Sequence, residues 1–235
     1  MVIKMNIESK TMTIDIWSDF VCPWCWIAKH RFEMALADFE HKDQIQVNYK
    51  AFRLAAGSRA APIKHVLVQK FGNEQSANGM IQAVVANAKE VGLVYNFDTM
   101  LFGDTSKAHA LVKAVEDSEI KKALSERLYK ASTTDGRSIF EQRSLAEIAA
   151  EVGISESFVE HAWNDETLSR LIDEDEKEAR KVANGVPLFF FNNDFHVSGA
   201  QPVEAFKQAL QRMHSDALET RSFQGQTCGL RGCDN

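Results

Sequence analysis

The sequence predicts an α/β fold that is interrupted by a large all-helical insertion. Strand-like segments occur near both ends of the chain, whereas the long segment between them shows helical periodicity. We expect residues 12–54 and 185–214 to form one α/β domain and residues 55–184 to form the insertion. Residues 215–235 are expected to form a C-terminal tail. A chain of 235 residues is long enough to bury the core of one such large domain.

The first predicted strand leads into a cysteine motif. Residues 12–17 alternate between apolar and polar side chains, which favours a strand. The motif Cys-Pro-Trp-Cys follows at residues 22–25, and apolar residues then recur with helical spacing to about Glu40. Pro23 suits the first position of that helix, because its missing N–H would have no partner there. The motif is therefore predicted to lie where a strand passes into a helix.

Two cysteines at this place suggest redox chemistry. At the start of a helix, unpaired backbone N–H groups and the helix dipole favour a thiolate at Cys22. The thiolate is the nucleophile of thiol–disulfide exchange, and Cys25 lies one helical turn further on. Two other interpretations stay open: a pair of buried structural cysteines, or half of a zinc site. The sequence holds no second C-x-x-C and no histidine pair after the motif to complete such a site.

The next segments extend the predicted fold. Residues 44–52 alternate again and predict a second strand, parallel to the first because a helix connects them. Residues 54–61 are small and polar, which indicates a loop. Helical spacing of apolar residues then begins. The predicted stripes are Met80, Ile81, Val84, Val85, Ala88 and Val91; Leu111, Val112 and Val115; and Ile120, Leu124 and Leu128.

Capping signals place further helices in the insertion. Ser144 and Glu147 have the spacing of a capping box, and Ser155 is a predicted N-cap of the following helix. A last helix is expected from about Glu166 to Ala183. Its acidic run, residues 173–178, is interpreted as a solvated face rather than a cation site, because a helix spreads consecutive side chains around its axis.

Strands return after the insertion. Residues 188–192 and 195–198 have strand character, and Asn193-Asp194 between them is typical of a hairpin turn. Pro202 then opens a helix that is expected to run to about Met213.

Composition narrows the class of protein. The net charge of −6 argues against a general binder of nucleic acid or anionic membranes. No segment approaches the roughly 20 apolar residues of a membrane span, and the first ten residues lack the apolar core of a signal peptide. We therefore expect a cytoplasmic protein. In a reducing cytoplasm, four cysteines indicate catalysis, sensing or metal binding rather than static cross-links.

The chain resembles the DsbA family of thioredoxin-fold oxidoreductases, and within it the cytoplasmic FrnE-like branch. The resemblance covers nearly the whole chain. A departure from the branch is Asp104, where asparagine is usual. The stretches that carry the resemblance are residues 18–25 (Ser-Asp-Phe-Val-Cys-Pro-Trp-Cys), residues 104–109 (Asp-Thr-Ser-Lys-Ala-His), Gly136-Arg-Ser with residues 145–149, and residues 185–190 (Gly-Val-Pro-Leu-Phe-Phe) with residues 198–202.

The resemblance implies a thioredoxin-like fold and roles for several residues. Cys22 is implied to be the exposed nucleophile and Cys25 the resolving cysteine. A cis bond is implied between Val186 and Pro187, whose backbone would pair with an extended substrate strand. The implied tuning residues of the active site are Pro23, Trp24, Asp19 and His109; for Asp19 a loop or cap role, and for His109 an ordinary structural role, remain alternatives.

The tail holds a second pair of cysteines. Cys228 and Cys233 flank Gly-Leu-Arg-Gly, which permits a tight local disulfide. The resemblance to FrnE-like proteins implies an auxiliary redox pair here. Two exposed thiols, or one zinc ion bound by all four cysteines, are the alternatives. No cofactor and no resident metal is expected.

The predicted function is a protein thiol–disulfide oxidoreductase or disulfide isomerase. Its partners would be thiol or disulfide proteins, with recycling by glutathione or a thioredoxin system. A first rival is a glutathione-dependent isomerase or transferase of small molecules, which typically has serine in place of the nucleophile and no resolving cysteine. A second rival is a redox-sensing or zinc-binding module without enzymatic activity.

Overall fold

The computed structural model describes residues 12–224. A four-stranded sheet has the order β2-β1-β5-β6. Its strands are β1 (Met12–Ser18), β2 (Ile45–Ala51), β5 (Leu188–Phe191) and β6 (Phe195–Ser198). Helix α1 (Pro23–Ala37) connects β1 to β2, which pair in parallel as the sequence predicts. The β1–β5 and β5–β6 pairs are antiparallel.

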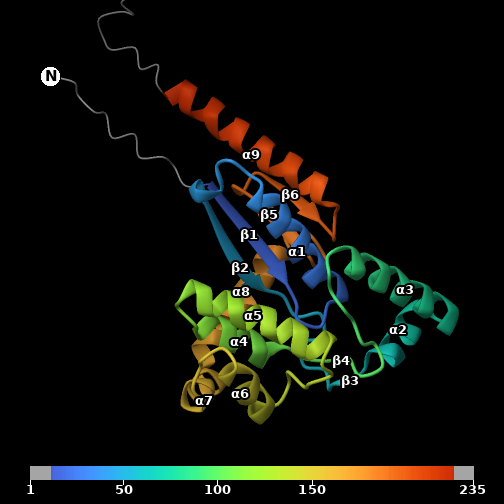
Figure 1. Ribbon diagram of the computed structural model, residues 1–235. Coiled ribbons are helices and arrows are strands. Elements are labelled where there is room, and N and C mark those ends of the chain that lie inside the picture. The colour runs from blue at the N-terminus through green and yellow to red at the C-terminus, as the bar shows by residue number, and fades with distance from the viewer. Residues whose placement is uncertain (1–11, 225–235) are drawn as a thin grey trace, which may run out of the picture.

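Helices cover both faces of this sheet (Figure 1). Side chains alternate between the faces of a strand, so Ile14 and Ile16 of β1 lie on one face and Trp17 on the other. The first face packs against α1 and α9 (Val203–Gln224), which also contact each other. Trp17 and Leu188 pack with Ala179, at the end of α8 (Glu166–Ala179). The result is a thioredoxin-like α/β fold with a helical insertion, as predicted.

The insertion gathers at one end of the sheet (Figure 1). Its helices share one large apolar core with Cys22, Cys25 and Trp26 of the active-site segment. The described insertion is not purely helical, because β3 and β4 form a two-stranded sheet. Strands of two residues leave no alternation to detect in a sequence. The remaining elements are η1 (Lys42–Gln44), β3 (Ala61–Pro62), α2 (Ile63–Phe71), α3 (Glu74–Glu90), β4 (Leu101–Phe102), α4 (Ser106–Ala114), α5 (Ser118–Thr133), α6 (Gln142–Ala150) and α7 (Glu156–Asn164).

Two predicted helix starts have different outcomes. Ser155 is the N-cap of α7, and its side chain accepts a hydrogen bond from the backbone N–H of Phe158, which confirms the prediction. The capping box at Ser144 is wrong. Helix α6 begins earlier, with Glu141 at its N-cap, and the Ser144 hydroxyl donates to the carbonyl oxygen of Ser138 instead. A hydroxyl can serve either partner, and sequence spacing alone does not select one.

Three boundaries near the C-terminus also differ from the predictions. Helix α8 ends at Ala179 rather than near residue 183. The hairpin turn contains Asn193 and Asp194 as predicted but begins one residue earlier, since β5 ends at Phe191 and Asn192 and Asn193 adopt positive φ angles of 49° and 55°. Helix α9 continues to Gln224, so the tail does not begin at residue 215. Its polar second half remains compatible with a helix, and the first glycine after Met213 is at position 225.

None of the helices in the described part of the chain is long and apolar enough to cross a membrane.

Candidate active site

The cysteine motif lies where the sequence predicts it, between β1 and α1. Cys22 is the N-cap residue of α1, with an extended backbone (φ −82°, ψ 114°), and Pro23 is the first helical residue. The N–H of Cys25 donates to the carbonyl oxygen of Cys22 at 3.1 Å. Both cysteines are free thiols. Cys22 therefore stands at the positive end of the helix, the position that favours a thiolate.

Both thiols are shielded from solvent, which corrects the expectation of an exposed Cys22. The exposed fractions are 4% for Cys22 and 2% for Cys25. The loop before β5 covers the nucleophile: Cys22 Sγ donates a weak hydrogen bond to the Val186 carbonyl oxygen at 3.6 Å. Burial, followed by the hydrogen bond with Cys22, raises the pKa of the Cys25 thiol well above its usual value. Cys25 is thus a protonated thiol at neutral pH.

The loop that covers Cys22 contains the cis bond that the resemblance implies. The Val186–Pro187 peptide bond is cis. Pro187 is buried and Val186 is half-buried, as is Trp24 of the motif. The backbone of Val186 therefore lies beside the dithiol, at the place where the resemblance puts an extended substrate strand.

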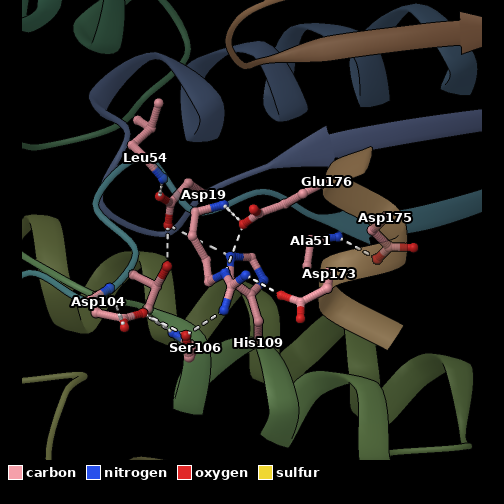
Figure 2. A network of polar contacts seen from close by, with 12 residues as sticks. Asp19, Ala51, Leu54, Asp104, Ser106, His109, Asp173, Asp175 and Glu176 are labelled. Atoms are coloured by element: carbon pink, nitrogen blue, oxygen red, sulfur yellow. Dashed lines mark hydrogen bonds and ion pairs between the residues drawn. The ribbon is translucent and has the colours of Figure 1, made fainter. Parts of the chain in front are cut away.

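Asp19 organises the loop that carries the motif (Figure 2). Its side chain is fully buried, and its backbone carbonyl accepts from the N–H of Cys22 at 3.1 Å. One carboxylate oxygen accepts from the Thr105 hydroxyl and the other from the backbone N–H of Leu54, both at 2.7 Å. These bonds tie the motif loop to the segment after β2 and to the start of α4. The structure thus gives Asp19 the loop-fixing contacts that we considered as one alternative.

His109 lies beside Asp19, as Figure 2 shows. It is on α4 and only 5% exposed, and its Nε2 atom is 3.6 Å from Asp19 Oδ1. Its ring packs on Phe20 with centroids 4.8 Å apart. The start of α4 is fixed by Asp104, which accepts from the N–H groups of Ser106 at 2.9 Å and Gly57 at 2.7 Å.

Asp104, where the sequence departs from the pattern that it otherwise resembles, keeps its negative charge. Burial raises the pKa of Asp104, but hydrogen bonds from Ser106 and Gly57 outweigh burial and lower it below its ordinary value. The carboxylate thus accepts hydrogen bonds from two backbone N–H groups.

Sequence reasoning missed Glu126 of α5. Its carboxylate accepts from Trp26 Nε1 and Lys29 Nζ and lies 2.8 Å from His30 Nε2. His30 of α1 is half-buried against this carboxylate. The insertion therefore contacts the active-site helix through a cluster of polar groups directly after Cys25.

The acidic run of α8 is not merely a solvated face, which corrects the prediction. Glu176 accepts from the backbone N–H and the side chain of Arg53, both at 2.7 Å. Asp175 accepts from the Ala51 N–H at 2.7 Å and pairs with Lys113 at 2.6 Å. Figure 2 shows these acidic side chains facing the end of β2. Basic residues far away in the sequence meet this helix, and a helical pattern alone does not reveal them.

No group of three or more potential metal ligands occurs among residues 12–224. Cys228 and Cys233 lie outside the described residues, so their predicted pairing stays a prediction.

Comparison with known proteins agrees with this site. Residues 13–211 match the model of the DSBA-like thioredoxin domain, and the chain belongs to that family. A crystal structure of a probable DsbA oxidoreductase from Streptomyces coelicolor is 31% identical, with a TM-score of 0.80, and the match covers 95% of this chain and 99% of the other. The chain is thus a DsbA-like thiol–disulfide oxidoreductase by family and by its C-x-x-C pair. No curated protein sequence matches it.

More distant structures share the fold alone. The cytosolic disulfide reductase DsbM from Pseudomonas aeruginosa, solved with GSH, is 19% identical with a TM-score of 0.62, and the match covers 86% of this chain and 99% of that chain. A 2-hydroxychromene-2-carboxylate isomerase is 15% identical with a TM-score of 0.66, and the match covers 88% of this chain and 98% of that chain. The same architecture therefore occurs in proteins described as disulfide reductases and as small-molecule isomerases.

Proposed function

We propose that this chain is a cytoplasmic protein thiol–disulfide oxidoreductase of the FrnE-like branch, with disulfide isomerase activity on its clients. The observation that carries the proposal is the arrangement of Cys22, Cys25 and the Val186–Pro187 loop. A thiol at a helix start, a buried second thiol one turn later and an adjacent backbone segment are the parts that disulfide exchange needs. A resolving cysteine also distinguishes the chain from the glutathione-dependent isomerases expected to carry serine at the nucleophile position.

The reaction proceeds by two exchanges. The Cys22 thiolate attacks one sulfur of a client disulfide, and the other client sulfur leaves as a thiolate. Cys25 then attacks Cys22 Sγ, which forms the Cys22–Cys25 disulfide and releases the second client thiolate. The client gains two electrons and the dithiol loses them. In isomerisation the client's own thiolate attacks the mixed disulfide before Cys25 does, and the dithiol is regenerated unchanged.

Partners and location are parts of the same proposal. The clients would be disulfide or thiol proteins, whose backbone pairs with that of Val186. Glutathione or a thioredoxin system would reduce the Cys22–Cys25 disulfide again. The cytoplasmic location is supported by the resemblance to the FrnE-like branch and by the ordinary, mildly acidic composition. Cys228 and Cys233 would act as an auxiliary pair that exchanges electrons with the motif.

A redox titration tests the proposal. The full chain is equilibrated in glutathione buffers of graded potential, free thiols are alkylated, and the labels on all four cysteines are mapped by mass spectrometry. We expect Cys22 and Cys25 to oxidise together in one two-electron step, with a second step if the tail cysteines form a pair. Cys22→Ser and Cys25→Ser are the matched controls, and each should abolish the first step. If the thiols react only after a chelator is added, they bind a metal ion. That result would contradict the oxidoreductase and support the zinc-binding module.

A further inference from the structure

A small cavity lies behind the resolving cysteine. Its volume is about 30 Å³, and Cys25, Pro187, His109 and Tyr129 contribute to its lining. A cavity of at least about 10–15 Å³ can hold a water molecule if two or more polar partners surround it. This cavity reaches the Cys25 thiol and the cis-proline loop. A molecule inside it would therefore contact the group that attacks Cys22 Sγ in the second exchange.

Two buried polar atoms of the cavity residues have no hydrogen-bond partner in the described part of the protein. They are Nε2 of His109 and the hydroxyl of Tyr129. His109 is 5% exposed and Tyr129 is 2% exposed. Ser18 lies near the Tyr129 hydroxyl but does not complete a hydrogen bond with it. An unpaired buried polar group costs about 1–3 kcal/mol, and a bridging water would satisfy both groups at once.

Cys25 needs a proton acceptor at this point of the reaction. Its thiol is buried and protonated, and only the thiolate attacks a disulfide. The charged side chains that face the cavity are unsuited to accept this proton. They are the three lysines Lys29 of α1, Lys50 of β2 and Lys113 of α4, and each is paired with a carboxylate. Burial raises the pKa of Tyr49 of β2, so it stays a protonated phenol.

His109 has the properties of an acceptor. An imidazole with a free ring nitrogen can accept a proton, and histidine is the commonest general base in enzymes. The fully buried carboxylate of Asp19, 3.6 Å from Nε2, would stabilise the resulting imidazolium. Asp19 is already held in place by Thr105 and Leu54.

We propose that a water molecule held between His109 Nε2 and the Tyr129 hydroxyl carries the proton of Cys25 to His109 when Cys25 resolves the mixed disulfide. The inference rests on the proposed function. The Cys25 S–H bond breaks, the water accepts that proton and passes one to Nε2, and the sulfur electron pair forms the bond to Cys22 Sγ. The bond between Cys22 and the client breaks, and the client leaves as a thiolate. The imidazolium then returns its proton to this thiolate or to solvent, and no external oxidant is needed.

A single-turnover measurement isolates this step. Cys22 is loaded with thionitrobenzoate as a mixed disulfide, and release of the coloured thiolate reports the attack by Cys25. For the unmodified chain we expect the rate to rise with pH and to reach a plateau, as a step assisted by one general base does. In His109→Gln, which keeps a polar side chain but cannot accept a proton, we expect a loss of about a hundredfold at neutral pH, the lower end of what general base catalysis contributes. Its rate should rise with pH without that plateau.

Further variants distinguish the proton transfer from Cys25 through water to His109, here called the relay, from a purely structural role of His109. Tyr129→Phe removes one partner of the water and should slow release by a smaller factor while keeping the plateau. His161→Gln makes the same exchange at an exposed histidine of α7 and should leave the rate unchanged. A merely structural role of His109 would lower the unfolding midpoint of His109→Gln without changing the shape of its pH profile. That result would overturn the relay.

The two proposals fail in different ways. Release from Cys25→Ser as fast as from the unmodified chain would contradict the proposed function, because resolution would not need Cys25. Normal resolution by His109→Gln would contradict the relay alone. If the variants do not fold, release from the unmodified chain is compared in heavy and ordinary water at pH values on the plateau. Slower release in heavy water supports a proton transfer in the rate-limiting step, and an unchanged rate excludes it.

Discussion

Trp26 of α1 donates a hydrogen bond of 2.8 Å from its indole Nε1 to Oε1 of Glu126 on α5. The same carboxylate accepts from Lys29 Nζ at 2.8 Å and lies 2.8 Å from His30 Nε2. Trp26 is 4% exposed and stacks on Tyr129 of the insertion. One side chain of the insertion therefore satisfies three polar groups of the helix that carries the dithiol.

Removing this carboxylate should destabilise the protein. In Glu126→Ala, Trp26 Nε1 and Lys29 lose an acceptor inside a mostly buried interface, which costs about 1–3 kcal/mol for such groups. Because the Glu126 side chain is 37% exposed, water can replace part of the loss, and we expect the lower half of that range. Urea unfolding measures the change. Asp38→Ala is the control, since it breaks an exposed pair with Lys207 and should shift the midpoint little.

The low pKa of Glu126 should make the free energy of unfolding depend on pH in the acid range. Burial raises the pKa of Glu126, but the hydrogen bond from His30 and the charge of Lys29 outweigh it and lower the pKa to about 2. A carboxyl group whose pKa is lower in the folded state than in the unfolded state stabilises the protein fully at pH values above the unfolded pKa, 4.5. This contribution is lost as the pH falls toward 2.

Unfolding free energies of the unmodified chain and of Glu126→Gln, measured across this pH window, test the prediction. The difference between the two proteins should shrink steadily as the pH is lowered. A difference that stays constant from neutral pH to the acid end of the window would show that Glu126 is not held in its charged form.

The strands and helices around the motif could be predicted because their signals are local. Residues 12–17 alternate, Pro23 opens a helix, and the apolar spacing after it has a helical period. Other boundaries depended on contacts that no local pattern contains. Ser144 fits a capping box by spacing, yet its hydroxyl bonds to Ser138. The short strands β3 and β4 exist only through their mutual pairing.

The candidate site divides in the same way. Cys22 and Cys25 are recognisable from four consecutive residues, since motif and helix start coincide. The groups around them come from distant parts of the chain: Thr105 is 86 residues from Asp19, and Glu126 is 100 residues from Trp26. Such pairs form when the insertion packs on α1, so a single sequence does not show them. The burial of Cys22 was missed for this reason, because the loop at Val186 covers it.

Asp175 of α8 should protect the end of strand β2. Its carboxylate accepts from the Ala51 N–H at 2.7 Å and pairs with Lys113. Since β2 is at the edge of the sheet, this bond replaces one that a further strand would make. Asp175→Ala should destabilise the protein by about 1–3 kcal/mol, because the N–H of the buried Ala51 loses its acceptor.

Hydrogen exchange resolves this effect to one residue. The amide of Ala51 should exchange faster in Asp175→Ala, whereas Asp175→Asn keeps an acceptor and should retain most of the protection. Glu174→Ala removes an exposed carboxylate from the same helix and is the matched control. Equal exchange of Ala51 in all four proteins would contradict the role given to Asp175.

Gly136 and Gly153 form a natural pair for testing a close contact. Both have positive φ angles, 66° and 82°, which disfavour any side chain. A Cβ atom added at Gly136 would lie 2.6 Å from Thr99, whereas one added at Gly153 meets no atom within 4 Å. Gly153→Ala should therefore cost only the strain of the left-handed backbone, about 1–2 kcal/mol. Gly136→Ala should cost clearly more, because Thr99 must also move and the turn after α5 must shift with it. Thermal or urea unfolding of the two variants compares these costs directly, and equal losses would show that Thr99 yields without resistance.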